Sequence, residues 1–329
     1  MQIKVNVIPD FRKREMAQRI SILYYEKDWS QNEISKELEI SRSYVSQLLS
    51  FARNSGIVKF TVNVDEYNLR MIRREIELKE KFPEVRQFYI MASESEEFTE
   101  RNLGSFAAPY FSELITDAKV IGVNLGRSVE KTIHNLKSHS LANSENKKVV
   151  QIMGGFNKDI AQAHPNELVK KLSSILNCEF YYLNCPAVIE QDKLREVLVK
   201  EKTIQNVIKM WHHMDLAIMG LGVTDDRSKL FSLFNESMKK DIKESGACSD
   251  LNINFFDEQG CYIPLLENHK ISIPFEELKN VRKKVVICSG EYKKRAIIGA
   301  IRAKMIDVLI TDTITMDAVE KYSESKESL

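Results

Sequence analysis

Seven short apolar runs recur beyond residue 83, each separated from the next by a segment with helical periodicity. The runs span residues 85–91, 120–123, 149–153, 180–183, 216–219, 285–288 and 308–310. Runs of this length between helices are typical of buried strands in a mostly parallel sheet with helices on both faces. We therefore predict an α/β domain over residues 84–329.

A different pattern occupies residues 29–56, where two short helices joined by a tight turn are predicted. Ser30 and Glu33 form a capping box that begins the first helix, and Ser41 can cap the second. Val45, Leu48 and neighbouring apolar residues recur at helical spacing and leave a polar face free. This layout is typical of a helix-turn-helix, in which the second helix enters a groove of DNA.

The free face of the second helix carries hydroxyl and amide side chains, whereas a helix designed only for solubility usually carries Glu and Lys. Such groups hydrogen-bond base edges or phosphates without repelling the DNA backbone. An ordinary helical core with a solvated, serine-rich face is the alternative. Residues 57–64 alternate like a strand and could form a wing, giving a winged helix-turn-helix. The predicted DNA contacts are Gln31, Ser41, Arg42, Ser43, Tyr44, Ser46, Gln47, Ser50 and Lys59.

The length of 329 residues favours more than one domain. We predict a helix-turn-helix domain over residues 1–66, a linker or dimerisation helix over residues 67–83 and an effector domain over residues 84–329. The middle helix has a narrow apolar seam that fits a linker or a dimer contact. Because the formal net charge is only +1, any DNA contact must come from a local patch, such as the basic residues between 11 and 19.

The five cysteines lack the spacing of metal ligands. They are typical of thiols in a reducing compartment, and no metal site or cofactor is predicted. The N-terminal residues lack the apolar run of a signal peptide, and no segment approaches the ~20 apolar residues of a membrane span. We therefore expect a cytoplasmic protein without a membrane partner.

Ligands of open parallel sheets bind beyond the C-terminal ends of the strands, so the residues that follow each apolar run are informative. The run at 120–123 is followed by N-L-G-R-S, where the amides of Arg127 and Ser128, after Gly126, could hold an anion such as phosphate. The same pattern also occurs in many folds without a ligand. Glycines after other runs suggest backbone packed around a small-molecule pocket. Further pocket candidates at these positions are Gly154, Gly155, Pro186 and Gly222.

Two charged residues stand out near the predicted strand ends. Asp250 lies between a turn and an alternating strand, where its carboxylate could accept hydrogen bonds from sugar hydroxyls. Lys293 precedes a predicted helix and could pair with a phosphate or a hydroxyl. Each could equally be a solvated surface charge.

The helix-turn-helix and seven later motifs occur in an order typical of a known family. The motifs are I-G-V-N-L-G-R-S, V-V-Q-I-M-G-G, H-P-N-E-L, D-L-A-I-M-G-L-G, G-A-C-S-D-L-N-I-N-F-F-D, G-E-Y-K-K-R-A-I-I-G-A-I-R and V-L-I-T-D. Over nearly its whole length, the chain thus resembles the SorC (sorbitol operon regulator) family of bacterial transcriptional regulators. It departs from the usual pattern in places, for example with Ser128 where threonine is common.

The resemblance implies an effector domain similar to sugar-phosphate isomerases and deaminases, used for sensing. It assigns the phosphate loop to residues 126–128 and effector contacts to Asp250 and Lys293, while the H-P-N-E-L motif adds Asn166. It also implies a homo-oligomer, a dimer or a tetramer, that binds double-stranded operator DNA. A carbohydrate effector, expected to be phosphorylated, would change operator affinity and thereby regulate genes of carbohydrate uptake or catabolism.

The main alternative is a sugar-phosphate isomerase or deaminase-like enzyme, because a carboxylate and a lysine beside a phosphate loop could transfer protons. However, none of the six histidines sits in a paired acid–base or metal-ligand spacing. A DNA-binding head also has no use in an isomerase. We therefore predict a regulator without catalytic residues.

Overall fold

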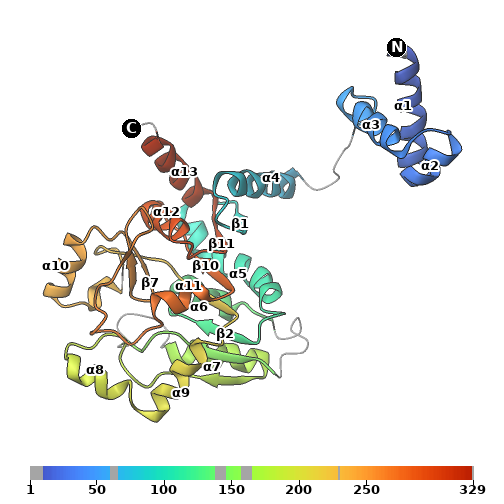
Figure 1. Ribbon diagram of the computed structural model, residues 1–329. Coiled ribbons are helices and arrows are strands. Elements are labelled where there is room, and N and C mark those ends of the chain that lie inside the picture. Colours follow the sequence, from blue (N-terminus) through green and yellow to red (C-terminus); the bar gives the residue numbers. More distant parts are fainter. Residues whose placement is uncertain (1–9, 60–65, 138–145, 157–164, 229, 328–329) are drawn as a thin grey trace, which may run out of the picture. The chain divides into compact units, whose positions relative to one another are not determined.

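The computed structural model describes residues 10–59, 66–137, 146–156, 165–228 and 230–327. The chain divides into two compact units, Met1–Asp65 and Glu66–Leu329 (Figure 1). Each unit has its own hydrophobic core.

Residues 10–59 of the smaller unit form three helices, α1 (Asp10–Tyr25), α2 (Gln31–Glu37) and α3 (Arg42–Asn54). The predicted capping box is present, because the Glu33 amide donates to the Ser30 hydroxyl at 3.3 Å and the Ser30 amide donates to the Glu33 carboxylate at 2.8 Å. Ser41 caps α3 by accepting a hydrogen bond from the Tyr44 amide at 3.2 Å. The three helices bury a common apolar core made of Ala17, Ile20, Ile34, Val45, Leu48, Leu49 and Ala52.

The wing predicted at residues 57–64 lies mostly outside the described residues. Residues 57–59, which are described, form a bend and an irregular segment rather than a strand. The wing therefore stays a prediction.

The larger unit is built on a seven-stranded sheet in which every neighbouring pair is parallel. The strands are β1 (Gln87–Met91), β2 (Val120–Val123), β3 (Lys148–Gln151), β4 (Glu179–Tyr181), β5 (Leu216–Met219), β10 (Lys283–Ile287) and β11 (Val308–Asp312). Their order is β1-β11-β10-β5-β2-β3-β4. After β2 the sheet continues with β3 and β4 on one side, and after β5 it continues with β10 and β11 on the other side. The topological switch point therefore lies between the adjacent strands β2 and β5. The predicted α/β fold is confirmed.

Helices cover both faces of this sheet (Figure 1). One face packs against α5 (Glu96–Leu114), α6 (Arg127–His134) and α7 (Pro165–Leu176), and the other against α9 (Lys202–Trp211), α11 (Phe275–Asn280), α12 (Lys294–Arg302) and α13 (Thr313–Glu327). Successive side chains of β5 point to opposite faces of the sheet: Leu216 and Ile218 enter the core on one face, whereas Ala217 and Met219 enter the core on the other. A strand that is buried on both faces reads as a continuous apolar run.

A second, antiparallel sheet was not predicted. It contains β6 (Gly222–Val223), β7 (Ser249–Leu251), β8 (Asn254–Phe256) and β9 (Tyr262–Ile263), in that order. It adjoins a third core, to which the 3₁₀ turn η2 (Phe231–Leu233) and helix α10 (Glu236–Glu244) contribute. Further elements of the larger unit are α8 (Asp192–Leu198) and the 3₁₀ turn η3 (Glu291–Lys293).

Helix α4 (Glu66–Lys81), expected as a linker or dimer contact, packs within the larger unit. Leu78 is fully buried in the core of that unit. Arg74 forms ion pairs with Asp317 and Glu320 of α13. One side of α4 is therefore fixed to the effector domain, while Ile72 and Ile76 are 47% and 56% exposed.

Candidate functional site

A cavity of about 350 Å³ opens in the larger unit at the C-terminal ends of β2 and β5. Its lining comes from helix α5 and from the C-terminal ends of five parallel strands and the segments that follow them, namely residues 124–128 after β2, Met153 and Phe156 after β3, 220–223 after β5, and residues within 287–293 and 312–315 at the ends of β10 and β11. This is the switch point of the sheet, where open α/β folds bind ligands. The antiparallel sheet contributes Gly222, Asp250 and Asn252 to the lining.

The N-terminus of α6 lies at this cavity. Gly126, its N-cap, and the following Arg127 and Ser128 all line the cavity, as the sequence predicted for a phosphate loop. No side chain caps the helix, so its first amides are left for a ligand or solvent. The positive end of the helix dipole and these amides together favour an anion.

Further cations lie in the lining. The Lys293 amine donates to the Leu221 carbonyl at 2.8 Å, and burial lowers the pKa of this amine. The Arg227 guanidinium pairs with Asp225 and lies 5.1 Å from the centroid of the Tyr292 ring. These basic groups lie beside carboxylates, since Arg227 is paired with Asp225 and Glu100 of the lining pairs with Arg127 at 3.0 Å.

Asp250 lies deep in the same cavity rather than on the surface, since it is only 5% exposed. Its Oδ1 has no hydrogen-bond partner among the described residues. Burial raises the pKa of Asp250 to about 7, although a hydrogen bond from the Ile253 amide and the charge of Lys270 act in the opposite direction. Gly222 lies close beside it: a Cβ there would be 2.9 Å from Asp250 Oδ2, so a larger residue would displace this carboxylate.

The end of β11, where the sequence has the V-L-I-T-D motif, supplies a fixed polar wall. The Thr315 hydroxyl donates to Asp312 Oδ2 at 2.6 Å, and the Gly290 amide donates to the same hydroxyl at 2.8 Å. Gly290 has φ +114°, a backbone conformation that favours glycine. Burial also raises the pKa of Asp312. The β10 and β11 loops are thus held together at the cavity.

Four predicted effector residues lie outside the lining: Gly154, Gly155, Asn166 and Pro186. The two glycines pack against a neighbouring loop, because a Cβ on Gly154 would lie 2.6 Å from the Pro186 carbonyl and Gly155 donates to the Cys185 carbonyl at 2.8 Å. The Asn166 amide is 3.4 Å from Asn184 Oδ1. Glycine at these positions therefore serves loop packing, and geometry gives no support for direct effector contacts.

The polar face of α3 in the smaller unit is open. Ser43, Ser46 and Gln47 are exposed, as are Ser41, Arg42 and Lys59. The other predicted DNA contacts, Gln31, Tyr44 and Ser50, are half-buried. The Ser50 hydroxyl accepts a hydrogen bond from Arg53 at 3.3 Å. Hydroxyl and amide donors thus lie along one side of α3, as readout of DNA requires.

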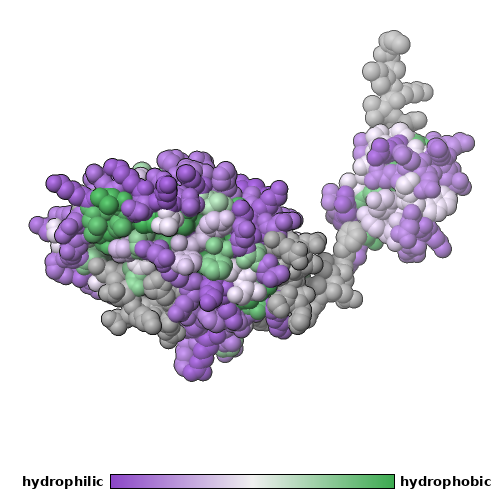
Figure 2. Space-filling model, turned by 90° about the horizontal axis from the view of Figure 1, so that it is seen from below, coloured by the Kyte–Doolittle hydropathy of each residue, from purple (hydrophilic) through white to green (hydrophobic). Residues whose placement is uncertain are grey.

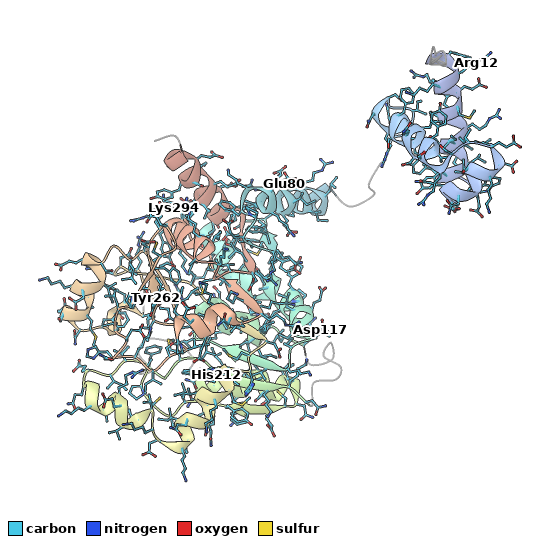
Figure 3. The ribbon with its side chains drawn as sticks, in the orientation of Figure 1. Arg12, Glu80, Asp117, His212, Tyr262 and Lys294 are labelled. Carbon is cyan, nitrogen blue, oxygen red and sulfur yellow. The ribbon has the colours of Figure 1, made fainter. Side chains whose placement is uncertain are left out.

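Several absences concern the described residues only. None of their histidines lines the cavity; His212, for example, caps α9 and lies 3.4 Å from Glu277 (Figure 3). No group of three or more potential ligands among them could hold a metal ion. Nor does any helix in the described ranges combine the length and apolar content needed to cross a membrane.

Together, a helix-turn-helix unit and an α/β unit with a polar cavity at its switch point define a ligand-responsive DNA-binding protein. Residues 67–319 match the family described as "Putative sugar-binding domain", and residues 17–55 match "Sigma-70, region 4". The chain belongs to this sugar-binding family of transcriptional regulators, the SorC type. The sequence prediction of a sugar-binding regulator with a DNA-binding helix-turn-helix is confirmed.

Relatives match over almost the whole chain. The Deoxyribonucleoside regulator of Bacillus subtilis (strain 168) is 26% identical over 313 residues, which cover 94% of this chain and 98% of that protein. The Sorbitol operon regulator of Klebsiella pneumoniae is 27% identical over 309 residues, covering 92% and 96%. The crystal structure of full-length SorC from Klebsiella pneumoniae has the same fold, with a TM-score of 0.70, 24% identity and coverage of 95% of this chain and 99% of that one. Both relatives are named as regulators rather than enzymes.

Proposed function

We propose that this regulator changes its affinity for operator DNA when a phosphorylated sugar binds in the cavity, and that it controls genes of carbohydrate uptake or catabolism. One observation carries the proposal: a single cavity combines the uncapped N-terminus of α6 with the buried carboxylate of Asp250. The first favours a phosphate, and the second accepts hydrogen bonds from hydroxyls. The protein would act in the cytoplasm, where bacterial operators lie.

Exposed apolar residues of the larger unit support a homo-oligomer. Ile72 and Ile76 are exposed on α4, and Leu194 and Val197 are 45% and 58% exposed on α8. Figure 2 shows apolar residues gathered within a hydrophilic surround on one face of this unit. Such patches mark interaction sites. In a dimer, two α3 helices would enter successive major grooves about 34 Å apart on a pseudo-palindromic operator.

An enzyme remains the rival function, because Asp250 and Lys293 line the same cavity. A measurement of sugar-phosphate turnover distinguishes an enzyme from a regulator. Purified protein incubated with common sugar phosphates is expected to leave them unchanged, while one of them raises its melting temperature by selective binding to the native state. The matching unphosphorylated sugars are expected to cause no shift. Conversion of any bound sugar phosphate, or equal shifts with the unphosphorylated parents, would contradict the proposal.

Replacing Gln47 with alanine is expected to weaken specific operator binding by about 1 to 3 kcal/mol, because an amide on the free face of α3 can pair with a base edge. The measurement is fluorescence anisotropy with operator and scrambled duplexes. Gln259→Ala, an exposed glutamine in the larger unit, serves as the control and should bind like the wild type. If operator preference is unchanged in Gln47→Ala, this residue does not read DNA sequence.

A further inference from the structure

One of the buried polar side chains in the cavity, Asn252, has no role assigned by the sequence. Asn252 is 1% exposed and lines the cavity. Its Oδ1 has no hydrogen-bond partner among the described residues. Within the described part of the chain, its Nδ2 donates only to the Met219 sulfur at 3.1 Å, a weak acceptor. A buried amide that lacks hydrogen-bond partners destabilises the free protein, and a ligand that hydrogen-bonds to it removes this destabilisation.

The backbone holds this amide in place. Asn252 and Ile253 form the two-residue turn between β7 and β8, and both have φ +58°. Such turns normally carry Asn-Gly, and a β-branched residue in this conformation is an outlier. The Ser272 hydroxyl donates to the Asn252 carbonyl at 2.5 Å, and the Lys270 amine donates to the Ile253 carbonyl at 2.9 Å. Backbone strain that is maintained by its surroundings is typical of functional sites.

Asp250 lies two residues before Asn252, and each presents an oxygen without a partner at the cavity. Oxygen acceptors are satisfied by donors, and hydroxyls are the donors that a sugar offers. A hydroxyl also accepts hydrogen bonds, so it satisfies either orientation of the Asn252 amide. We infer that Asp250 and Asn252 bind two neighbouring hydroxyls of the sugar, and that Asn252 selects a hydroxylated sugar phosphate over its deoxy analogue. This inference rests on the proposed function.

Asn252→Gly is the sharpest variant, because glycine adopts the left-handed conformation of the turn and only the side chain is lost. Asn177→Gly is the matched control, since Asn177 also has positive φ (+49°) but is exposed and lies outside the cavity. The probes are ribose 5-phosphate with 2-deoxyribose 5-phosphate, glucose 6-phosphate with 2-deoxyglucose 6-phosphate, and inorganic phosphate. Affinities are measured by calorimetry on the full chain.

The wild type is expected to bind the hydroxylated member of at least one pair about tenfold more tightly than the deoxy member, because an unmet polar group penalises the analogue. Asn252→Gly should bind that sugar about tenfold more weakly and lose the preference, with its affinity for inorganic phosphate unchanged and its melting temperature no lower than that of the wild type. Asn177→Gly should behave like the wild type.

Four outcomes would overturn the inference in distinguishable ways. Retention of the preference by Asn252→Gly removes the selective role and leaves the proposed function intact. An equal loss for both sugars and for inorganic phosphate means that the residue is structural. If the wild type binds the deoxy members more tightly, hydroxyl selection is rejected. If the wild type binds none of the four sugar phosphates, both hydroxyl selection and the proposed effector class are rejected.

Discussion

Ser128→Asp is expected to abolish the response to a phosphorylated sugar, with at least about a 100-fold loss of effector affinity. Ser128 is the second residue of α6 and lines the cavity. An aspartate there would bring a negative charge next to the bound phosphate, and two like charges about 4 Å apart repel by about 4 kcal/mol at an effective dielectric constant of 20. Folding should not suffer, because a carboxylate in the first turn of a helix is stabilising.

The measurement is effector affinity by calorimetry, together with DNA affinity of the free protein, which should remain at the wild-type value. Ser128→Thr is the matched control, since it keeps the hydroxyl and adds no charge, and it should still respond. A full response in Ser128→Asp would place the phosphate elsewhere in the cavity.

Asp250→Asn is expected to stabilise the free protein at neutral and alkaline pH and to lower the affinity for the effector about 10- to 100-fold. Because burial raises the pKa of Asp250 to about 7 from its ordinary 3.8, the folded state binds the proton more tightly than the unfolded state. Stability therefore falls as the pH rises from about 4 to about 7, by a total on the order of 4 kcal/mol, and is flat above. Asparagine has no charge to bury, so this loss disappears.

The affinity for the effector depends on pH in the opposite direction to the stability. Sugar hydroxyls that donate to Asp250 favour its carboxylate, so effector affinity of the wild type should rise with pH through about 7, whereas that of Asp250→Asn should not. Hydrogen bonds to a charged group contribute about 1.5–3 kcal/mol, which sets the expected loss. Melting temperatures and calorimetric affinities between pH 5.5 and 8.5 measure both effects. Asp117→Asn, an exposed carboxylate (Figure 3), is the control. Identical pH profiles for the wild type and Asp250→Asn would show that Asp250 does not titrate here.

Local signals in the sequence predicted much of this architecture. The capping box of Ser30 and Glu33 depends on two residues three positions apart, so it can be recognised from the sequence alone. The strands of the parallel sheet are buried on both faces and therefore read as apolar runs. The antiparallel sheet escaped notice because strands as short as Gly222–Val223 carry no periodic pattern.

The cavity could be predicted only in part. Its anion end could be predicted from local sequence, since Gly126 lies between a strand and a helix and Ser128 lies in the first turn of that helix. The burial of Asp250 and the orientation of Asn252 depend on contacts with distant segments, such as Ser272, that no spacing reveals. Gly154 illustrates the limit of the sequence: glycine indicates close backbone approach but not what approaches, and here the Pro186 carbonyl does.

Reciprocal coupling tests the central claim most directly. The dissociation constant for operator DNA is measured with and without a saturating sugar phosphate, and the dissociation constant for the sugar phosphate is measured with and without operator. If the cavity controls DNA binding, both constants change by the same factor, because linkage between two sites is symmetric. A sugar phosphate that binds in the cavity, as shown by its loss in Ser128→Asp, yet leaves operator affinity unchanged would contradict it.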